Sequence, residues 1–237
     1  MLVTGLVLLV TASFAGCGDS DQNKSAKPST DRQPSPEVRQ PVPNVLTEVE
    51  SAAEDTVDFA REGNRPEVIA TTQKLRRLAQ GRAAATLRRA GVADARIRAL
   101  QDRSRRVTQL ARNSDPLQIS LAANQVSALM PEFYARYSDP VPPDVLELDY
   151  LDREVQLRSR AGDADAARAA AVKLSAIWPR LRARLTAAGG AKVALDYGRH
   201  VAAVGRLAAG RKRRALQKEA SHGLAVVDLI ENVFRAR

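Results

Sequence analysis

The sequence contains few of the residues that bind metals, form disulfides or stack on ligands. It has one cysteine, two histidines, two methionines and 4% aromatic residues in a chain of 237. A single cysteine excludes an intrachain disulfide, and it also excludes the Cys-x-x-Cys-His attachment of a c-type haem. A b-type haem held by His and Met is disfavoured, because Met130 lies in the other half of the chain from both histidines.

The motifs of the common catalytic sites are missing as well. The chain has no Gly-x-Ser-x-Gly elbow, no glycine-rich phosphate loop and no His-Glu-x-x-His. These absences exclude the most familiar hydrolase, nucleotide-binding and zinc-protease sites. We therefore expect a protein that is not an enzyme and that carries no cofactor.

The longest apolar run stands at the start of the chain. Residues 2–15 are almost wholly apolar, and the run closes in Phe14-Ala15-Gly16-Cys17. This length is short for a bilayer span but typical of the apolar core of a signal peptide. The segment resembles the signal peptide and lipobox of bacterial lipoproteins, in which a peptidase cuts before the cysteine and the sulfur carries diacylglycerol.

The resemblance implies a cleaved signal peptide over 1–16 and lipidation of Cys17, the only cysteine. The implied partner is a lipid bilayer, contacted through acylated Cys17. The implied location is extracytoplasmic, with the chain lipid-anchored at the cell membrane or the outer membrane.

The stretch that follows, residues 17–43, predicts a disordered linker. It is poor in apolar residues, contains five prolines, and carries four acidic and four basic side chains. Such a composition buries too little apolar surface to offset the entropy lost on ordering. The net charge of +10 therefore belongs to the remainder of the chain.

From residue 44 onward the composition predicts an all-α fold. Alanine, leucine, arginine and glutamate dominate, and no segment alternates as a strand does. Residues 61–64 recur in similar form 99 positions later, as residues 160–163. Most of the apolar positions of residues 97–111 recur 97 positions later. This repeat predicts two tandem four-helix units produced by internal duplication, over 44–139 and 140–237.

Capping residues and glycines mark the breaks between helices. Asn64, Asp115 and Asp163 are N-cap residues in type, and Gly91 and Gly189 stand where left-handed turns end helices. The sequence leaves open whether the two units pack as one body. The expected helices cover 44–62, 66–90, 94–112 and 116–137 in the first unit, and 143–161, 165–188, 191–209 and 213–235 in the second.

Trp178 lies on the most regular apolar stripe, which steps by four and three residues from Ala167 to Ala188. Such a stripe is typical of helices that pack at shallow angles, so a core position is the favoured interpretation. The alternative is a carrier of a metal, haem or small ligand in the second unit, built around Trp178, Tyr197 and His200.

Basic residues form two clusters, and the second unit is the more basic. A pI near 10.3 would ordinarily raise nucleic acid as a partner. Export argues against that partner, so we expect no nucleic acid and instead an anionic surface or an envelope protein. The candidate contacts are Arg96, Arg98, Arg103, Arg105 and Arg106, together with Arg211, Lys212, Arg213 and Arg214.

Acidic residues line one side of the first expected helix. Glu50, Glu54 and Asp58 follow one another at four-residue steps, and like charges at this spacing repel one another. We expect the stripe to face a basic neighbour such as the helix that carries Arg96 to Arg106. This structural role is preferred to a metal or catalytic carboxylate cluster.

The two histidines offer a weak metal site. Asp196 and His200 are four apart, and Glu219 and His222 form a Glu-x-x-His. Di-iron bundles use this motif twice, and the first unit has no second copy of it. We expect the histidines to lie at the surface or at the flank of the packed faces.

The sequence thus favours a non-catalytic binding or scaffolding role at the cell envelope. A metal, haem or small-ligand carrier is one alternative. An accessory subunit of an envelope transporter or signalling system is another, and the oligomeric state stays open.

Overall fold

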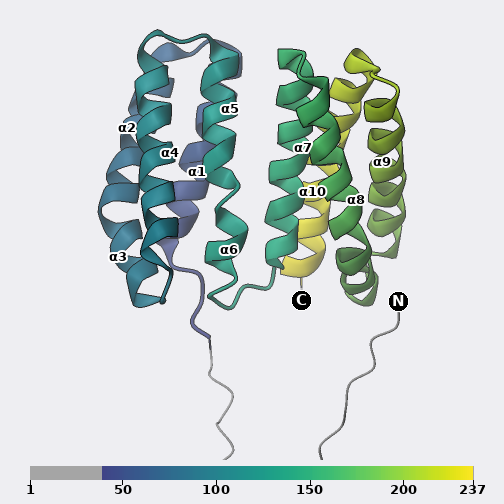
Figure 1. The fold of residues 1–237 in the computed structure, drawn as a ribbon. Helices are drawn as coiled ribbons and strands as arrows, with labels where there is room; N and C mark the ends of the chain where they lie inside the picture. The colour runs from purple at the N-terminus through teal and green to yellow at the C-terminus, as the bar shows by residue number, and fades with distance from the viewer. Residues whose placement is uncertain (1–38, 237) are drawn as a thin grey trace, which may run out of the picture. The chain divides into compact units, whose positions relative to one another are not determined.

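The computed structural model describes residues 39–236, and this part of the chain is all-α, as predicted. The signal peptide, Cys17 and most of the expected linker lie outside the described residues. Figure 1 shows the helices running alternately up and down. They are α1 (Asn44–Glu62), α2 (Arg65–Gln80), α3 (Arg82–Arg89), α4 (Asp94–Asn113), α5 (Pro116–Ser127), α6 (Met130–Tyr134), α7 (Pro143–Ala161), α8 (Ala164–Ala187), α9 (Ala191–Ala209) and α10 (Arg213–Arg235).

The helices form two groups that lie side by side (Figure 1). In the first, α1 packs against α2 and α5, and α4 packs against the same two helices; in the second, α7, α8, α9 and α10 close a four-helix ring. The groups meet where α5 and α6 pack against α7. One hydrophobic core cluster runs through both groups, so residues 39–236 form a single body.

The two groups are built alike at their turns. Helices α7 and α8 begin 99 residues after α1 and α2, and α9 and α10 begin 97 residues after α4 and α5. Gly63 and Gly162 both adopt left-handed conformations, with φ of 75° and 78°. Asn64 and Asp163, which follow them, both cap the next helix with a side-chain oxygen. These parallels fit the predicted duplication, which itself stays a prediction.

Two of the expected helices are interrupted. The expected helix over 66–90 divides into α2 and α3 at Gly81, whose φ of −106° and ψ of −107° are not helical. The expected helix over 116–137 divides into α5 and α6. Pro131 stands four residues after Ser127 and has no N–H to donate to that carbonyl, so α5 ends there.

The last residues of the expected linker pack on the helical body. The backbone N–H of Ser138 donates to the carbonyl of Gln40 at 2.8 Å, and Arg39 Nη1 donates to the carbonyl of Ala135 at 3.1 Å. Residues 39 and 40 therefore contact the helical body next to the turn that follows α6.

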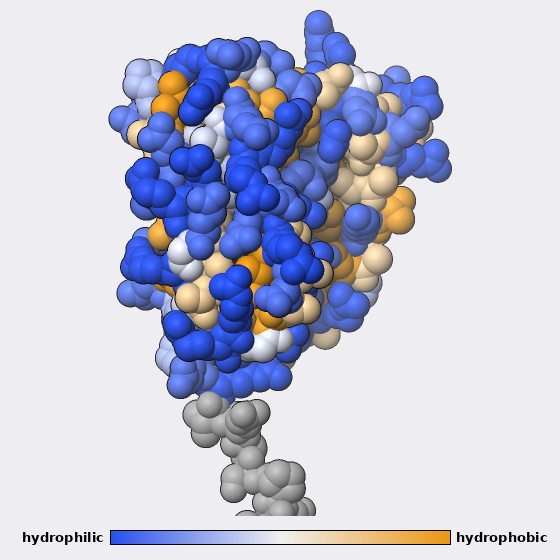
Figure 2. Space-filling view, turned by 60° about the vertical axis from the view of Figure 1, so that its left-hand side comes forward, coloured by the Kyte–Doolittle hydropathy of each residue, from blue (hydrophilic) through white to orange (hydrophobic). Residues whose placement is uncertain are grey.

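The predicted core stripe of α8 is confirmed. Ala167, Ala171, Leu174, Leu181 and Leu185 are buried, and Trp178 lies among them with 6% of its surface exposed. The face drawn in Figure 2 is mostly hydrophilic, and its apolar residues are scattered in small groups. Over residues 39–236, no helix has both the length and the apolarity that crossing a bilayer requires.

Candidate functional site

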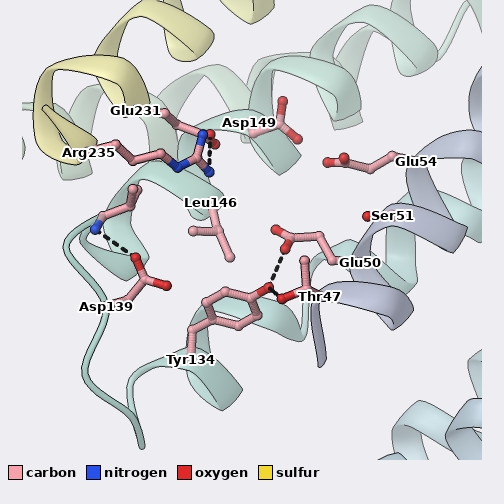
Figure 3. Close-up of a pocket in the computed structure, with 11 residues that line it drawn as sticks. Thr47, Glu50, Ser51, Glu54, Tyr134, Asp139, Leu146, Asp149, Glu231 and Arg235 are labelled. Atoms are coloured by element: carbon pink, nitrogen blue, oxygen red, sulfur yellow. Dashed lines mark hydrogen bonds and ion pairs between the residues drawn. The ribbon is translucent and has the colours of Figure 1, made fainter. Parts of the chain in front are cut away.

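A cavity of about 230 Å³ opens between the two helix groups. Its walls come from the first half of α1, from α6 and the turn after it, from the start of α7 and from the end of α10 (Figure 3). Although the chain as a whole is basic, five carboxylates line this cavity against one arginine. The acidic cavity is lined by Thr47, Glu50, Ser51, Glu54, Tyr134, Asp139, Val141, Leu146, Asp149, Glu231 and Arg235.

Helix periodicity places these carboxylates. Glu50 and Glu54 lie one turn apart on α1, so both reach the same cavity wall. Across the cavity, Arg153 on α7 pairs with Asp149 at 2.7 Å and with Glu54 at 3.3 Å. At the other side, Arg235 pairs with Glu231 at 2.7 Å.

Glu50 has no such cation. It accepts a short hydrogen bond from the hydroxyl of Tyr134, which also contacts Thr47 Oγ1 at 3.4 Å. Within the described range, no lysine or arginine forms an ion pair with Glu50. The cavity therefore holds one carboxylate whose only strong partner is a neutral phenol.

Burial shifts the titration of these groups. Burial raises the pKa of Glu50 to about 7, although the hydrogen bond from Tyr134 lowers it and the charges of Glu231 and Asp149 raise it further. Burial also raises the pKa of Glu54 to about 8, with Arg153 opposing the shift. The pKa of Glu231 is raised in the same direction by burial. Burial is the largest cause of each shift, and neighbouring carboxylates add to it.

The expectation for the acidic stripe of the first helix was wrong about its neighbour. The stripe does not face the arginines of α4: Glu54 faces Arg153 of α7, and Glu50 faces Tyr134 of α6. Asp58 points outward and pairs with Arg61 at 3.0 Å. The reason is the packing order: α1 packs between α2 and α5, and its acidic side reaches α7 through the Glu54–Arg153 ion pair.

His200 lies in the core of the second group, contrary to the expected surface position. Its side chain has no exposed surface, and Nε2 is 2.8 Å from Oδ1 of the equally buried Asp152. Its Nδ1 is 3.1 Å from Glu219 Oε1, and Tyr197 donates its hydroxyl to Asp152 Oδ2 at 2.6 Å. The rings of Trp178, Tyr197 and His200 pack in series, with centroids 4.9 and 5.0 Å apart.

This buried network also shifts pKa values. Burial lowers the pKa of His200, but its hydrogen bonds and charge interactions with Asp152 and Glu219 outweigh burial and raise it overall. Burial raises the pKa of Asp152, opposed by His200 and Tyr197. Both imidazole nitrogens are thus occupied by carboxylates.

The four weak metal candidates form two pairs, which adjoin where the rings of His200 and His222 meet edge to face with centroids 6.1 Å apart. His200 contacts Glu219, whereas His222 lies half-exposed at 4.0 Å from Asp196. In the portion of the chain that the structure describes, no three histidine, cysteine or acidic side chains are placed to hold a metal ion.

The arginines of α4 are partly engaged within the protein. Arg96 donates to Glu132 at 2.7 Å, Arg103 donates to the carbonyl of Gln125, and Arg105 pairs with Asp102. Arg98 and Arg106 are exposed and form no ion pair with residues 39–236. The second basic cluster lies in the turn between α9 and α10 and at the start of α10.

The architecture defines a helical-bundle protein, in which two adjoining helix groups, α1–α6 and α7–α10, enclose an acidic cavity. No family model, curated protein or solved structure matches the chain.

Proposed function

We propose that the chain is a lipid-anchored, extracytoplasmic binding protein of the cell envelope, and that the acidic cavity binds an organic ammonium ligand. The anchor is the acylated Cys17 that the lipobox implies. The observation that carries the binding proposal is the cavity itself, with five carboxylates, one lining arginine and a Glu50 that forms no ion pair with the described residues.

An ammonium group fits this cavity better than a metal ion does. The carboxylates come from separate walls, and no three of those in the described residues converge on one point. A flexible amine can contact carboxylates that are spread over a cavity of about 230 Å³. The positive charge of the amine would stabilise the ionised form of Glu50, which burial disfavours. Each charge-assisted hydrogen bond from the amine would also be stronger than a neutral one.

We expect putrescine and spermidine to bind the protein in isothermal titration calorimetry, and uncharged butanediol to fail. Glu50→Gln and Glu54→Gln should each weaken amine binding roughly tenfold, because a hydrogen bond to a charged group is lost. Asp55→Asn is the matched control, because Asp55 is exposed on the same helix. Equal affinities in Glu50→Gln, Glu54→Gln and the control would exclude the acidic cavity as the site.

Amine binding should also strengthen as the pH rises from about 6 to about 9. The cause is the raised pKa of Glu50, about 7, and of Glu54, about 8, since both carboxyls are neutral below these values and charged above them. The groups that face them are the neutral phenol of Tyr134 from α6, and the charged or titratable side chains of Asp149 and Arg153 from α7 and of Glu231 and Arg235 from α10. An affinity that is flat over this range would contradict the assignment.

The anchor is tested separately. Cells fed radiolabelled palmitate should label the wild-type protein, and globomycin should cause the unprocessed form to accumulate. Cys17→Ala should abolish the label and release the protein from the membrane fraction. An unlabelled wild type whose Cys17→Ala form fractionates identically would remove the anchor without affecting the binding proposal.

A further inference from the structure

A second cavity lies at the opposite end of the α7–α10 group from the acidic cavity. The acidic cavity uses the start of α7 and the end of α10, whereas this one is lined by the end of α7, the start of α8, the end of α9 and the start of α10. Its volume is about 200 Å³. Ala167, Ala208 and Leu216 give it an apolar floor, and Ser159, Arg211 and Arg213 supply its polar groups.

The hydroxyl of Ser159 is the first sign of a ligand. Ser159 is 3% exposed, lines the cavity, and its Oγ has no hydrogen-bond partner in the described residues. Ser104 and Ser175 donate to backbone carbonyls one turn earlier, at 2.8 and 3.1 Å. Ser127 in α5 also has a buried hydroxyl without a partner, but only Ser159 of these two lines the cavity. A buried hydroxyl without a partner costs free energy, which an acceptor bound in the cavity would recover.

The start of α10 is the second sign. Like α1, α3, α4, α6, α7 and α9, α10 has no side-chain cap, and its first turn contains no acidic residue. It begins instead with Arg213 and Arg214, although cations are unfavourable at a helix N-terminus. Arg213 forms no ion pair with residues 39–236, and its Nη1 lies 3.8 Å from where a Cβ on Gly162 would stand. A bound anion would compensate both the helix terminus and the guanidinium.

Arg211 is the third sign. Its φ of 52° makes it the one non-glycine residue with a left-handed backbone in the described residues. Other turns of this protein place glycine in that conformation, as Gly91 and Gly189 do. Here Gly210 stands one position earlier, and the unfavourable conformation falls on an arginine that lines the cavity. Its only ion pair, with Asp165 at 3.5 Å, is highly exposed and contributes little.

The matching end of the first helix group lacks these features. A smaller cavity of about 80 Å³ lies there, lined by apolar residues and by Arg65. At the offsets of 99 and 97 residues, Ala60 replaces Ser159, Pro116 replaces Arg213 and Ser114 replaces Arg211. Arg65 donates to the carbonyls of Arg112 and Ser114, so its guanidinium caps a helix end. The polar set is therefore specific to the second group.

We propose that the cavity at the α9–α10 turn binds a phosphate group that carries a small aliphatic substituent. Arg211 and Arg213 contact the phosphate oxygens, the free N–H groups of the first turn of α10 face it, and Ser159 donates its hydroxyl. Ala167, Ala208 and Leu216 receive the substituent. Two guanidinium groups, a helix N-terminus and a hydroxyl together are the donor set typical of phosphate recognition. The site is independent of the acidic cavity and of the lipid anchor.

The test uses the full chain and three phosphate probes: inorganic phosphate, glycerol phosphate and vesicles of phosphatidylglycerol, with phosphatidylcholine vesicles for comparison. Glycerol phosphate should bind more tightly than inorganic phosphate in calorimetry, because it also contacts the apolar floor. Binding to phosphatidylglycerol vesicles without binding to the soluble probes would identify the phosphate source as a lipid headgroup.

Variants locate the site. Ser159→Ala and Arg213→Gln should each weaken binding roughly tenfold, whereas Arg106→Gln removes an equal charge from exposed α4 and should change little. Arg211→Gly should weaken binding and yet raise Tm by about 2 °C, since glycine accepts the left-handed backbone. A fold that is more stable and binds less well excludes unfolding as the cause. The proposal would be overturned if none of the three probes bound, or if Ser159→Ala and Arg213→Gln lost no more affinity than Arg106→Gln.

Discussion

Replacement of His200 by alanine should lower the free energy of unfolding by about 3–5 kcal/mol, because it leaves a buried carboxylate without its cationic partner. Asp152 has no exposed side-chain surface and would retain only the hydrogen bond from Tyr197. His222→Ala should change stability by less than about 0.5 kcal/mol, since His222 is half-exposed and its contact with Asp196 is 4.0 Å. Urea denaturation of the two variants, followed by circular dichroism, measures the difference.

The volume of the imidazole contributes to this loss, and a second variant separates packing from charge. His200→Phe fills the space but cannot donate to Asp152, so it should remain nearly as destabilised as His200→Ala. His200→Gln keeps one donor and should recover part of the loss. If His200→Phe were as stable as the wild type, the hydrogen bonds to Asp152 and Glu219 would not be the source of the stability.

The penalty for His200→Ala should grow as the pH rises from about 4 to about 6.5, the ordinary pKa values of aspartate and histidine. Burial raises the pKa of Asp152, and loss of the imidazole raises it further, because His200 opposes that shift. Between these values the folded variant then holds more protons than the unfolded chain, so its stability falls with increasing pH. In the wild type the hydrogen bond and charge of His200 oppose the rise in the pKa of Asp152, so the wild type loses less stability over the same range.

Helix periodicity and capping residues predict where several of the helices begin and end. Helices α1 and α7 have the expected bounds of 44–62 and 143–161, because a glycine follows each and stops it in a left-handed turn. The expected helices over 66–90 and 116–137 are each divided in two. Gly81 and Pro131 were visible in the sequence, but whether a glycine or a proline interrupts a helix depends on the packing around it.

The candidate sites show the limit more clearly. The sequence drew attention to Glu50, Glu54 and His200, yet their partners come from α6, α7 and α10, which are distant in sequence. Periodicity indicates which residues share a helix face but not which helix covers that face. The partners Arg153 and Asp152 stand among several other charged residues of α7, so nothing in the sequence singled them out.

Gly223→Ala should destabilise the protein by about 3 kcal/mol, although the same change in the middle of a helix ordinarily stabilises it. A Cβ on Gly223 would stand 2.6 Å from Asp152 Oδ2 and would also overlap the His200 ring, closer than real Cβ contacts. Because both neighbours are buried and joined by a hydrogen bond, neither can move without breaking the network. The glycine therefore makes room for the His200–Asp152 pair between α7, α9 and α10.

Gly205→Ala is the matched control, since a Cβ at that position in α9 meets no atom within 4 Å. It should stabilise the fold by about 0.5–1 kcal/mol through the better helix propensity of alanine. In the double variant His200→Ala with Gly223→Ala, the missing ring provides space for the new methyl group. The double variant should then lose clearly less free energy of unfolding than the two single variants lose in sum, because residues in contact do not act additively. Strict additivity, or a Gly223→Ala protein as stable as Gly205→Ala, would mean that Gly223 does not pack against the buried pair.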